Sequence, residues 1–326
     1  MSGGEVVVVC AADAGYAMPL AVTLRSAARS LAPGRSLRVF VIDDGLGAEL
    51  RSRVARSLPA TVRLEWVDGD AGAVDAIATW GRMPRTTFQR LLVGRLLPPG
   101  VARAIWLDCD VVVEADLGRL WDAPMEGRLL LAARDMAVPT VSSRLGVPGH
   151  AELGIPPEAP YFNAGVMVID VDAWREGDVA GRVMRYLLGR SSPPLLWDQE
   201  GLNAVLHAEW ARIDVRWNVN AGLAGRPFGR SPDLDDATLR AVAEDPWIVH
   251  HCGRLKPWRI HDTGDPARAR WLAHLDSTDW AGWRPRPTPA RRLAAAYESS
   301  RLRALVHPVE SRGFEAMALL SRGRRR

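Results

Sequence analysis

The most constraining feature of this chain is a continuous apolar run near its start, Val6-Val7-Val8-Val9-Cys10-Ala11. A β-branched run without alternating polar positions is typical of a strand that is buried on both faces. Residues 19–31 follow with apolar side chains at helical spacing, which predicts an amphipathic helix. Apolar runs at 37–42 and 62–67 flank a helical stretch at 47–57. This alternation predicts a mostly parallel sheet in a doubly wound α/β domain.

The rest of the chain continues this pattern. We expect helices at 88–97 and 198–208, strands at 104–107, 129–133, 165–169 and 247–250, and a short basic helix at 290–305. Residues 138–160 are rich in Pro and Gly, which favours a surface loop near the site. With 326 residues, the chain is long enough for one large domain and a smaller appendage. We expect these to be a catalytic domain at 1–262 and a Trp- and Pro-rich basic extension at 263–326.

Charge and cysteine usage indicate which cellular compartment and which partners to expect. The first apolar run is too short for a signal peptide or a spanning helix, so we expect a cytoplasmic protein. Three scattered cysteines without a CxxC pair predict free thiols. Residues 284–326 hold eleven arginines and three glutamates. This tail is either a solvated segment or a peripheral contact with an anionic membrane or acidic acceptor. No nucleic acid is expected, because no basic groove interleaved with aromatic residues accompanies it.

A pair of carboxylates follows the expected strand at 104–107, in Asp108-Cys109-Asp110. In open α/β sheets, ligands bind outside the carboxyl ends of strands. Two hard oxygen donors there suit Mg²⁺ or Mn²⁺, which commonly bridge carboxylates and nucleotide phosphates. The alternative is a turn with a local side-chain hydrogen bond and a helix cap.

A second polar segment follows the expected strand at 247–250, running from His250 to Trp258. The His250 imidazole would complete a metal site with the two aspartates and favour Mn²⁺ over Mg²⁺. Gly253 permits close backbone approach. Of the 42 basic residues only Lys256 is a lysine, which suggests a place where a compact ammonium is needed, such as a diphosphate-binding site. The alternative is that the single lysine is a chance of composition.

The loop after the first strand, from Ala11 to Tyr16, is not GxGxxG, which argues against a dinucleotide-binding dehydrogenase. No GxxxxGK[ST] motif occurs either, so a P-loop enzyme is not expected. Tyr16 would suit stacking on a base and Asp13 hydrogen bonding to a nucleoside. The alternative for Asp13 is a plain helix N-cap.

Together these segments resemble glycosyltransferase family 8, the group that includes lipopolysaccharide galactosyltransferases and glycogenin. The resemblance covers residues 6–262. The blocks that carry it, in chain order, are Ala11-Ala12-Asp13-x-x-Tyr16, Arg90, Leu107-Asp108-x-Asp110, Tyr161-Phe162-Asn163-Ala164-Gly165-Val166, Trp197-Asp198-Gln199 and His250-x-x-Gly253-x-x-Lys256-Pro257-Trp258. Each block is weak alone, but their order and spacing together are specific. The resemblance implies a GT-A fold, with a mostly parallel Rossmann-like sheet flanked by helices and a small helical basic extension.

The resemblance also implies a role for each matched residue. The Mn²⁺ ligands would be Asp108, Asp110 and His250, with Mg²⁺ as an alternative ion. The UDP-sugar donor would be bound by Ala11, Asp13, Tyr16, Asp108, Cys109, Asp110, Gly253 and Lys256. The donor sugar and the reaction would involve Arg90, Asp135, Asn163, Asp198 and Gln199. His251 stands where the family usually has an aromatic or small residue, so the metal is assigned to His250.

The implied activity is a metal-dependent, retaining transfer of a hexose from UDP-glucose or UDP-galactose to a hydroxyl of a glycan, lipid-linked or small-molecule acceptor. The sequence departs from the family at Ala14-Gly15 and at Glu200, where relatives often have Asp-Asn and Asp. The first departure removes one potential hydrogen bond to the nucleotide or ribose. A nucleotidyltransferase is an alternative, but it usually needs a basic glycine-rich loop near the first strand. A catalytically dead nucleotide-sugar-binding protein is another, against which the intact carboxylates argue.

Overall fold

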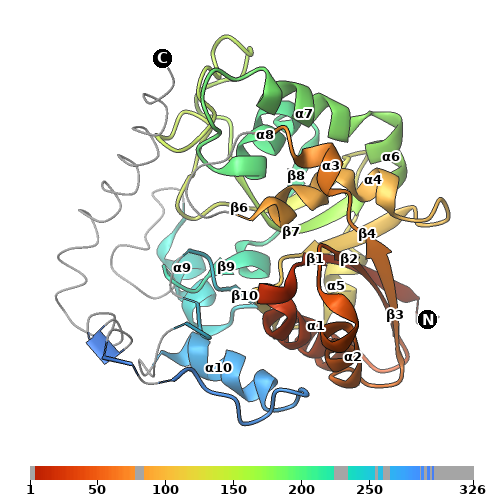
Figure 1. Cartoon of the computed structure of the whole chain (residues 1–326). Coiled ribbons are helices and arrows are strands. Elements are labelled where there is room, and N and C mark those ends of the chain that lie inside the picture. Colours follow the sequence, from red (N-terminus) through yellow and green to blue (C-terminus); the bar gives the residue numbers. More distant parts are fainter. Residues whose placement is uncertain are drawn as a thin grey trace.

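The computed structural model describes residues 4–77, 84–223, 234–253, 256–259, 265–286, 288–289, 292–293 and 296. Its centre is a seven-stranded sheet in the order β3-β2-β1-β4-β7-β6-β8 (Figure 1). The strands are β1 (Glu5–Ala12), β2 (Ser36–Asp43), β3 (Val62–Asp68), β4 (Arg103–Leu107), β6 (Leu130–Arg134), β7 (Phe162–Asp170) and β8 (Trp210–Arg212).

One strand of this sheet runs against the others. Neighbouring strands β3, β2, β1 and β4 are parallel, and so are β6 and β8, whereas β7 pairs antiparallel with both β4 and β6. The prediction of a mostly parallel sheet is confirmed. The reversal has a consequence for the site, because the beginning of β7 lies at the same edge as the ends of β4 and β6.

Strand β1 is buried on both faces, as its apolar run predicts. Val6 and Val8 belong to an apolar cluster with α1 (Ala17–Ser30) and α2 (Gly47–Arg56). Val7 and Val9 belong to a second cluster on the opposite face. That cluster is closed by α4 (Val93–Leu96), α6 (Val171–Glu176), α7 (Val179–Leu188) and α8 (Trp197–Leu206). Figure 1 shows these two helical layers on either side of the sheet.

The helix expected at 88–97 begins earlier and is wound differently from a plain α-helix. The chain forms a 3₁₀ helix, η2 (Arg85–Leu92), that passes into the single α-helical turn of α4. Tighter 3₁₀ winding brings side chains three residues apart into line. The side chains of Thr87 and Arg90 both contact the Asp198 carboxylate.

A small second sheet lies beside the carboxyl end of β4, in the order β5-β10-β9. Its strands are β5 (Val111–Val113), β10 (Ile248–His250) and β9 (Val219–Asn220). Antiparallel pairing puts His250 opposite Val111, and the His251 amide donates to the Asp110 carbonyl over 2.9 Å. Two segments about 140 residues apart are therefore fixed next to each other.

The remaining described helices are short or peripheral: η1 (Ala14–Tyr16), α3 (Ala71–Val74), α5 (Leu117–Trp121), η3 (Val215–Asn218), α9 (Asp236–Glu244) and α10 (Pro266–Leu275). Trp271 and Leu275 of α10 belong to the same apolar cluster as Val6. The loop at 138–160 has its own small core, in which Val138, Val141, Val147 and Ile155 meet Tyr161.

The expected basic helix at 290–305 lies outside the described residues, apart from 292–293 and 296. The domain division at 262 stays a prediction. Within the described part of the chain, no helix combines the length and apolarity that crossing a bilayer requires. The three cysteines are free thiols, as expected.

Candidate active site

The predicted site residues meet at one edge of the large sheet. Asp13 follows β1, Asp108 follows β4 and Asp135 follows β6, so these parallel strands deliver their carboxylates to one edge. Asn163 and Gly165 arrive at that edge from the beginning of the reversed β7. The Asp108 amide donates to the Gly165 carbonyl over 2.8 Å, which joins β4 to β7 at this point.

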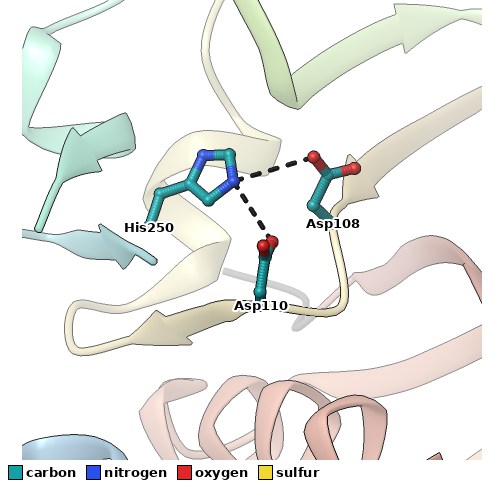
Figure 2. Close-up of side chains that lie close together, drawn as sticks. All are labelled: Asp108, Asp110 and His250. Carbon is teal, nitrogen blue, oxygen red and sulfur yellow. Dashed lines mark ion pairs between the residues drawn. The ribbon is translucent and has the colours of Figure 1, made fainter. Parts of the chain in front are cut away.

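Three side chains at this edge form a candidate metal centre. One ligand atom from each of Asp108, Asp110 and His250 lies within 4.8 Å of the others. The His250 Nε2 is 3.2 Å from Asp110 Oδ1 and 3.7 Å from Asp108 Oδ2. Figure 2 shows the imidazole edge facing both carboxylates. Two carboxylates and an imidazole fit Mn²⁺, which accepts hard oxygen ligands and one nitrogen.

The backbone of β7 makes room for this cluster at Gly165. A Cβ there would lie 2.2 Å from His250 Cε1, 2.7 Å from His250 Nδ1 and 3.0 Å from Asp108 Oδ2. Real side chains do not approach so closely. Glycine at this position is therefore a packing requirement of the candidate metal centre.

Lys256 contacts the same cluster. Its ammonium donates to Asp110 Oδ2 and, over 2.7 Å, to the His251 carbonyl, and the residue is only 7% exposed. Burial lowers the pKa of Lys256, but Asp110, Tyr16 and Cys252 together raise it by more, so the net shift is upward and the ammonium stays charged. Burial would raise the pKa of Asp110, yet Lys256 and His250 hold it well below its usual range.

His251 does not take part in the cluster. Its side chain is buried, and its Nε2 has no hydrogen-bond partner among the described residues. Burial lowers the pKa of His251 to about 3, so its ring is neutral. For His250, burial lowers the pKa, but Cys252 and Asp110 raise it well above the ordinary value. The structure thus brings His250, and not His251, to the carboxylates.

Arg90 links the metal centre to the start of α8. Its Nη2 donates to Asp108 Oδ1 over 2.9 Å, and its Nε lies 2.7 Å from Asp198 Oδ2. Burial lowers the pKa of Arg90, but the charges of Asp108 and Asp198 oppose this effect. The net shift is upward, so the guanidinium remains charged. Thr87 donates to the other Asp198 oxygen over 3.0 Å.

The remaining predicted residues form a hydrogen-bonded group beside the metal centre. Asp135 Oδ2 accepts from Asn163 Nδ2 over 2.8 Å and from Gln199 Nε2 over 3.1 Å. The Gln199 Oε1 accepts from the Ala164 amide over 3.0 Å. Asp135 Oδ1 caps the base of the 138–160 loop by accepting from the Ala137 and Val138 amides.

The loop predicted to hold the nucleoside lies next to Asp108. Asp13 accepts from the Tyr16 amide over 3.1 Å, so it caps η1, which was the alternative reading of this residue. The Tyr16 ring meets Trp258 edge to face, with 5.7 Å between centroids. The Cys109 thiol donates to the Ala11 carbonyl over 3.0 Å. Gly253 has φ +79°, a conformation that favours glycine.

Sequence reasoning missed several residues that contact this group. Trp106 Nε1 donates to Asp108 Oδ1 over 2.9 Å, and Asn218 Oδ1 lies 2.8 Å from His250 Nδ1. Asn203 accepts from the Phe162 amide and donates to the Gln199 carbonyl. Trp106 precedes Asp108 by two residues. Since residues two apart in a strand lie on the same face, its contact with Asp108 could have been predicted. No local pattern marks Asn218 or Asn203.

Relatives of this chain are found over most of its length. General stress protein A of Bacillus subtilis (strain 168) is 26% identical over 277 residues, which is 84% of this chain and 94% of that protein. Glycosyltransferase GlyF of Streptococcus pneumoniae serotype 4 is 22% identical over 278 residues, which is 84% of this chain and 62% of that protein.

Solved structures share the fold. The galactosyltransferase LgtC, in complex with donor and acceptor sugar analogs, has a TM-score of 0.71 at 24% identity, covering 89% of this chain and all of that one. The bifunctional glycosyltransferase WbbM, in its apo form, has a TM-score of 0.70 at 23% identity, covering 85% of this chain and 50% of that one. The model of glycosyl transferase family 8 matches residues 7–262. The chain has the GT-A fold and belongs to glycosyl transferase family 8.

Proposed function

We propose that this chain is a Mn²⁺-dependent, retaining hexosyltransferase that uses UDP-glucose or UDP-galactose. The observation that carries the proposal is the cluster of Asp108, Asp110 and His250 with the Lys256 ammonium beside it. Family membership supports glycosyl transfer over the nucleotidyl transfer that the sequence also allowed.

The chemistry requires stabilisation of a leaving diphosphate. The bond between the sugar and the phosphate breaks with positive charge on the anomeric carbon and negative charge on the departing UDP. A divalent cation at the cluster, with Mg²⁺ as the alternative to Mn²⁺, supplies a Lewis acid for that charge. The Lys256 ammonium, which contacts Asp110 in this structure, would contact the diphosphate instead and stabilise its negative charge. Arg90 keeps Asp108 oriented through its 2.9 Å contact.

The surroundings of the sugar side favour front-side attack over a protein nucleophile. Both ends of the Gln199 amide are occupied, by Asp135 and by the Ala164 amide. Asp198 is 3% exposed and is held by Arg90 and Thr87. Neither side chain is free to attack the anomeric carbon. In the front-side path, the leaving phosphate oxygen takes the proton of the acceptor hydroxyl.

The acceptor in this proposal is a hydroxyl of a glycan, a lipid-linked sugar or a small molecule. The 138–160 loop stands beside the sugar end of the site, because Asp135 joins its base to Asn163 and Gln199. We assign acceptor choice to this loop. A peripheral contact of the basic tail with the cytoplasmic membrane face belongs to the same proposal.

Donor turnover in two variants tests the proposal. UDP release from UDP-glucose and UDP-galactose is measured in Mn²⁺ for the wild type, Asp108→Asn and Asp110→Asn. Loss of one metal carboxylate is expected to reduce the rate by at least about 100-fold. The matched control is Asp68→Asn, whose carboxylate is 95% exposed on the far strand β3. Full activity in either metal-centre variant contradicts the proposal, and a wild type that binds UDP-sugar without turnover favours a dead binding protein.

A further inference from the structure

A buried asparagine that carries no assigned role touches the metal histidine from behind. Asn218 ends η3, directly before β9, and is 3% exposed. Its Oδ1 lies 2.8 Å from His250 Nδ1, and its Nδ2 lies 2.9 Å from Asn163 Oδ1. The imidazole nitrogen that faces Asn218 is the one opposite the carboxylates, because Nε2 faces Asp110 and Asp108.

One backbone group, the Gly165 amide, determines the directions of the hydrogen bonds that join Asn163, Asn218 and His250. The Gly165 amide donates over 2.9 Å to the Asn163 side-chain atom that also faces Asn218, so that atom is an oxygen. An oxygen accepts only, and the Asn218 atom facing it must be the NH₂ group. The Asn218 oxygen therefore faces His250, and the His250 Nδ1 must carry a hydrogen to donate to it.

We infer that Asn218 is a positioning residue that sets the tautomer of His250 and leaves Nε2 free for a metal ion. The inference rests on the proposed function, because the tautomer of His250 matters only if His250 binds a metal ion. Partners behind a ligating histidine typically fix its ring and its tautomer in this way. The same hydrogen bonds engage the Asn163 amide with Gly165, Asn218 and Asp135.

The position of Asn218 is held from the other side by the second sheet. The Ala221 amide donates to the His250 carbonyl over 2.9 Å, and the Trp247 amide donates to the Arg216 carbonyl over 2.9 Å. The Arg216 guanidinium also lies 3.7 Å from the centre of the Trp247 ring. These contacts join the chain before Asn218 (Arg216) and after it (Ala221) to residues 247–250. The amide thus meets the imidazole without a flexible loop between them.

The test compares two replacements of Asn218 by titrating Mn²⁺ against purified full-length protein and reading free Mn²⁺ by electron paramagnetic resonance. Asn218→Leu removes the acceptor, so we expect the Mn²⁺ dissociation constant to rise about 10- to 100-fold. Asn218→Asp keeps an acceptor for Nδ1 and is expected to bind Mn²⁺ more tightly than Asn218→Leu. The control is Asn220→Ala, since the Asn220 side chain accepts from the Gly222 amide and serves a local turn.

The outcomes separate this inference from the proposed function. A wild type that binds no Mn²⁺ contradicts both. A wild type that binds Mn²⁺ while Asn218→Leu binds it equally well contradicts the inference alone. If Asn218→Leu does not fold, Asn218→Ala decides, because it also removes the acceptor for Nδ1, and a folded Asn218→Ala that binds Mn²⁺ as tightly as the wild type contradicts the inference. Melting temperatures without metal show whether each variant is folded.

Discussion

Replacing Gly165 with alanine probes the packing of the metal centre with the smallest change available. The new Cβ would lie 2.2 Å from His250 Cε1, whereas ordinary contacts begin near 3.4 Å. The imidazole or strand β7 must therefore shift by about 1 Å, well beyond the ~0.2 Å spread of ligand distances in a metal site. A displacement of about 1 Å in a catalytic geometry typically costs about 100-fold. We expect Mn²⁺ affinity and donor turnover each to fall by about that factor.

The assay for Gly165→Ala is isothermal titration with Mn²⁺, followed by UDP release at saturating metal. The control is Gly100→Ala, because a Cβ at Gly100 meets no atom within 4 Å. A melting temperature near that of the control shows that the variant is folded. Wild-type Mn²⁺ affinity in folded Gly165→Ala would refute the argument that this glycine makes room for the His250 ligand.

Two further changes test the charged groups around the metal centre. Lys256→Arg puts a planar guanidinium into a buried space that fits an ammonium, so UDP affinity in Mn²⁺ should fall about tenfold, measured by titration. Exposed Arg63→Lys serves as its control, and equal UDP affinity would show that the lone lysine is incidental. Asp198→Asn leaves the buried Arg90 without one partner, so the free energy of unfolding in urea should drop by about 2–3 kcal/mol. A drop no larger than that of exposed Asp68→Asn would contradict the structural role of this ion pair.

Much of the fold follows from sequence periodicity. The run at 6–11 predicts a strand buried on both faces, and the structure divides its side chains between two cores. The direction of β7 was not predictable in the same way. An apolar run has the same pattern in either direction, and the reversal depends on pairing with β4 and β6 far along the chain. Likewise, helical periodicity at 88–97 does not distinguish 3₁₀ from α winding before tertiary packing is known.

The candidate site divides along similar lines. Asp108, Asp110 and His250 follow strands and carry ligand chemistry, so their types and places in the sequence point to a metal. The structure brings them together. Asn218 could not be identified in this way, because it contacts His250 and Asn163, which lie 32 and 55 residues away in the sequence. Only the folded arrangement shows that an asparagine just before a two-residue strand lies against His250.

The proposed function requires that Asp108, Asp110 and His250 together hold a metal that the reaction needs. The most direct measurement is UDP release from UDP-glucose and UDP-galactose by wild-type protein after metal removal with a chelator, and again after Mn²⁺ is restored. We predict that turnover of at least one donor disappears without metal and returns with Mn²⁺, with Mg²⁺ less effective. Turnover that continues unchanged in the chelated protein would contradict the account.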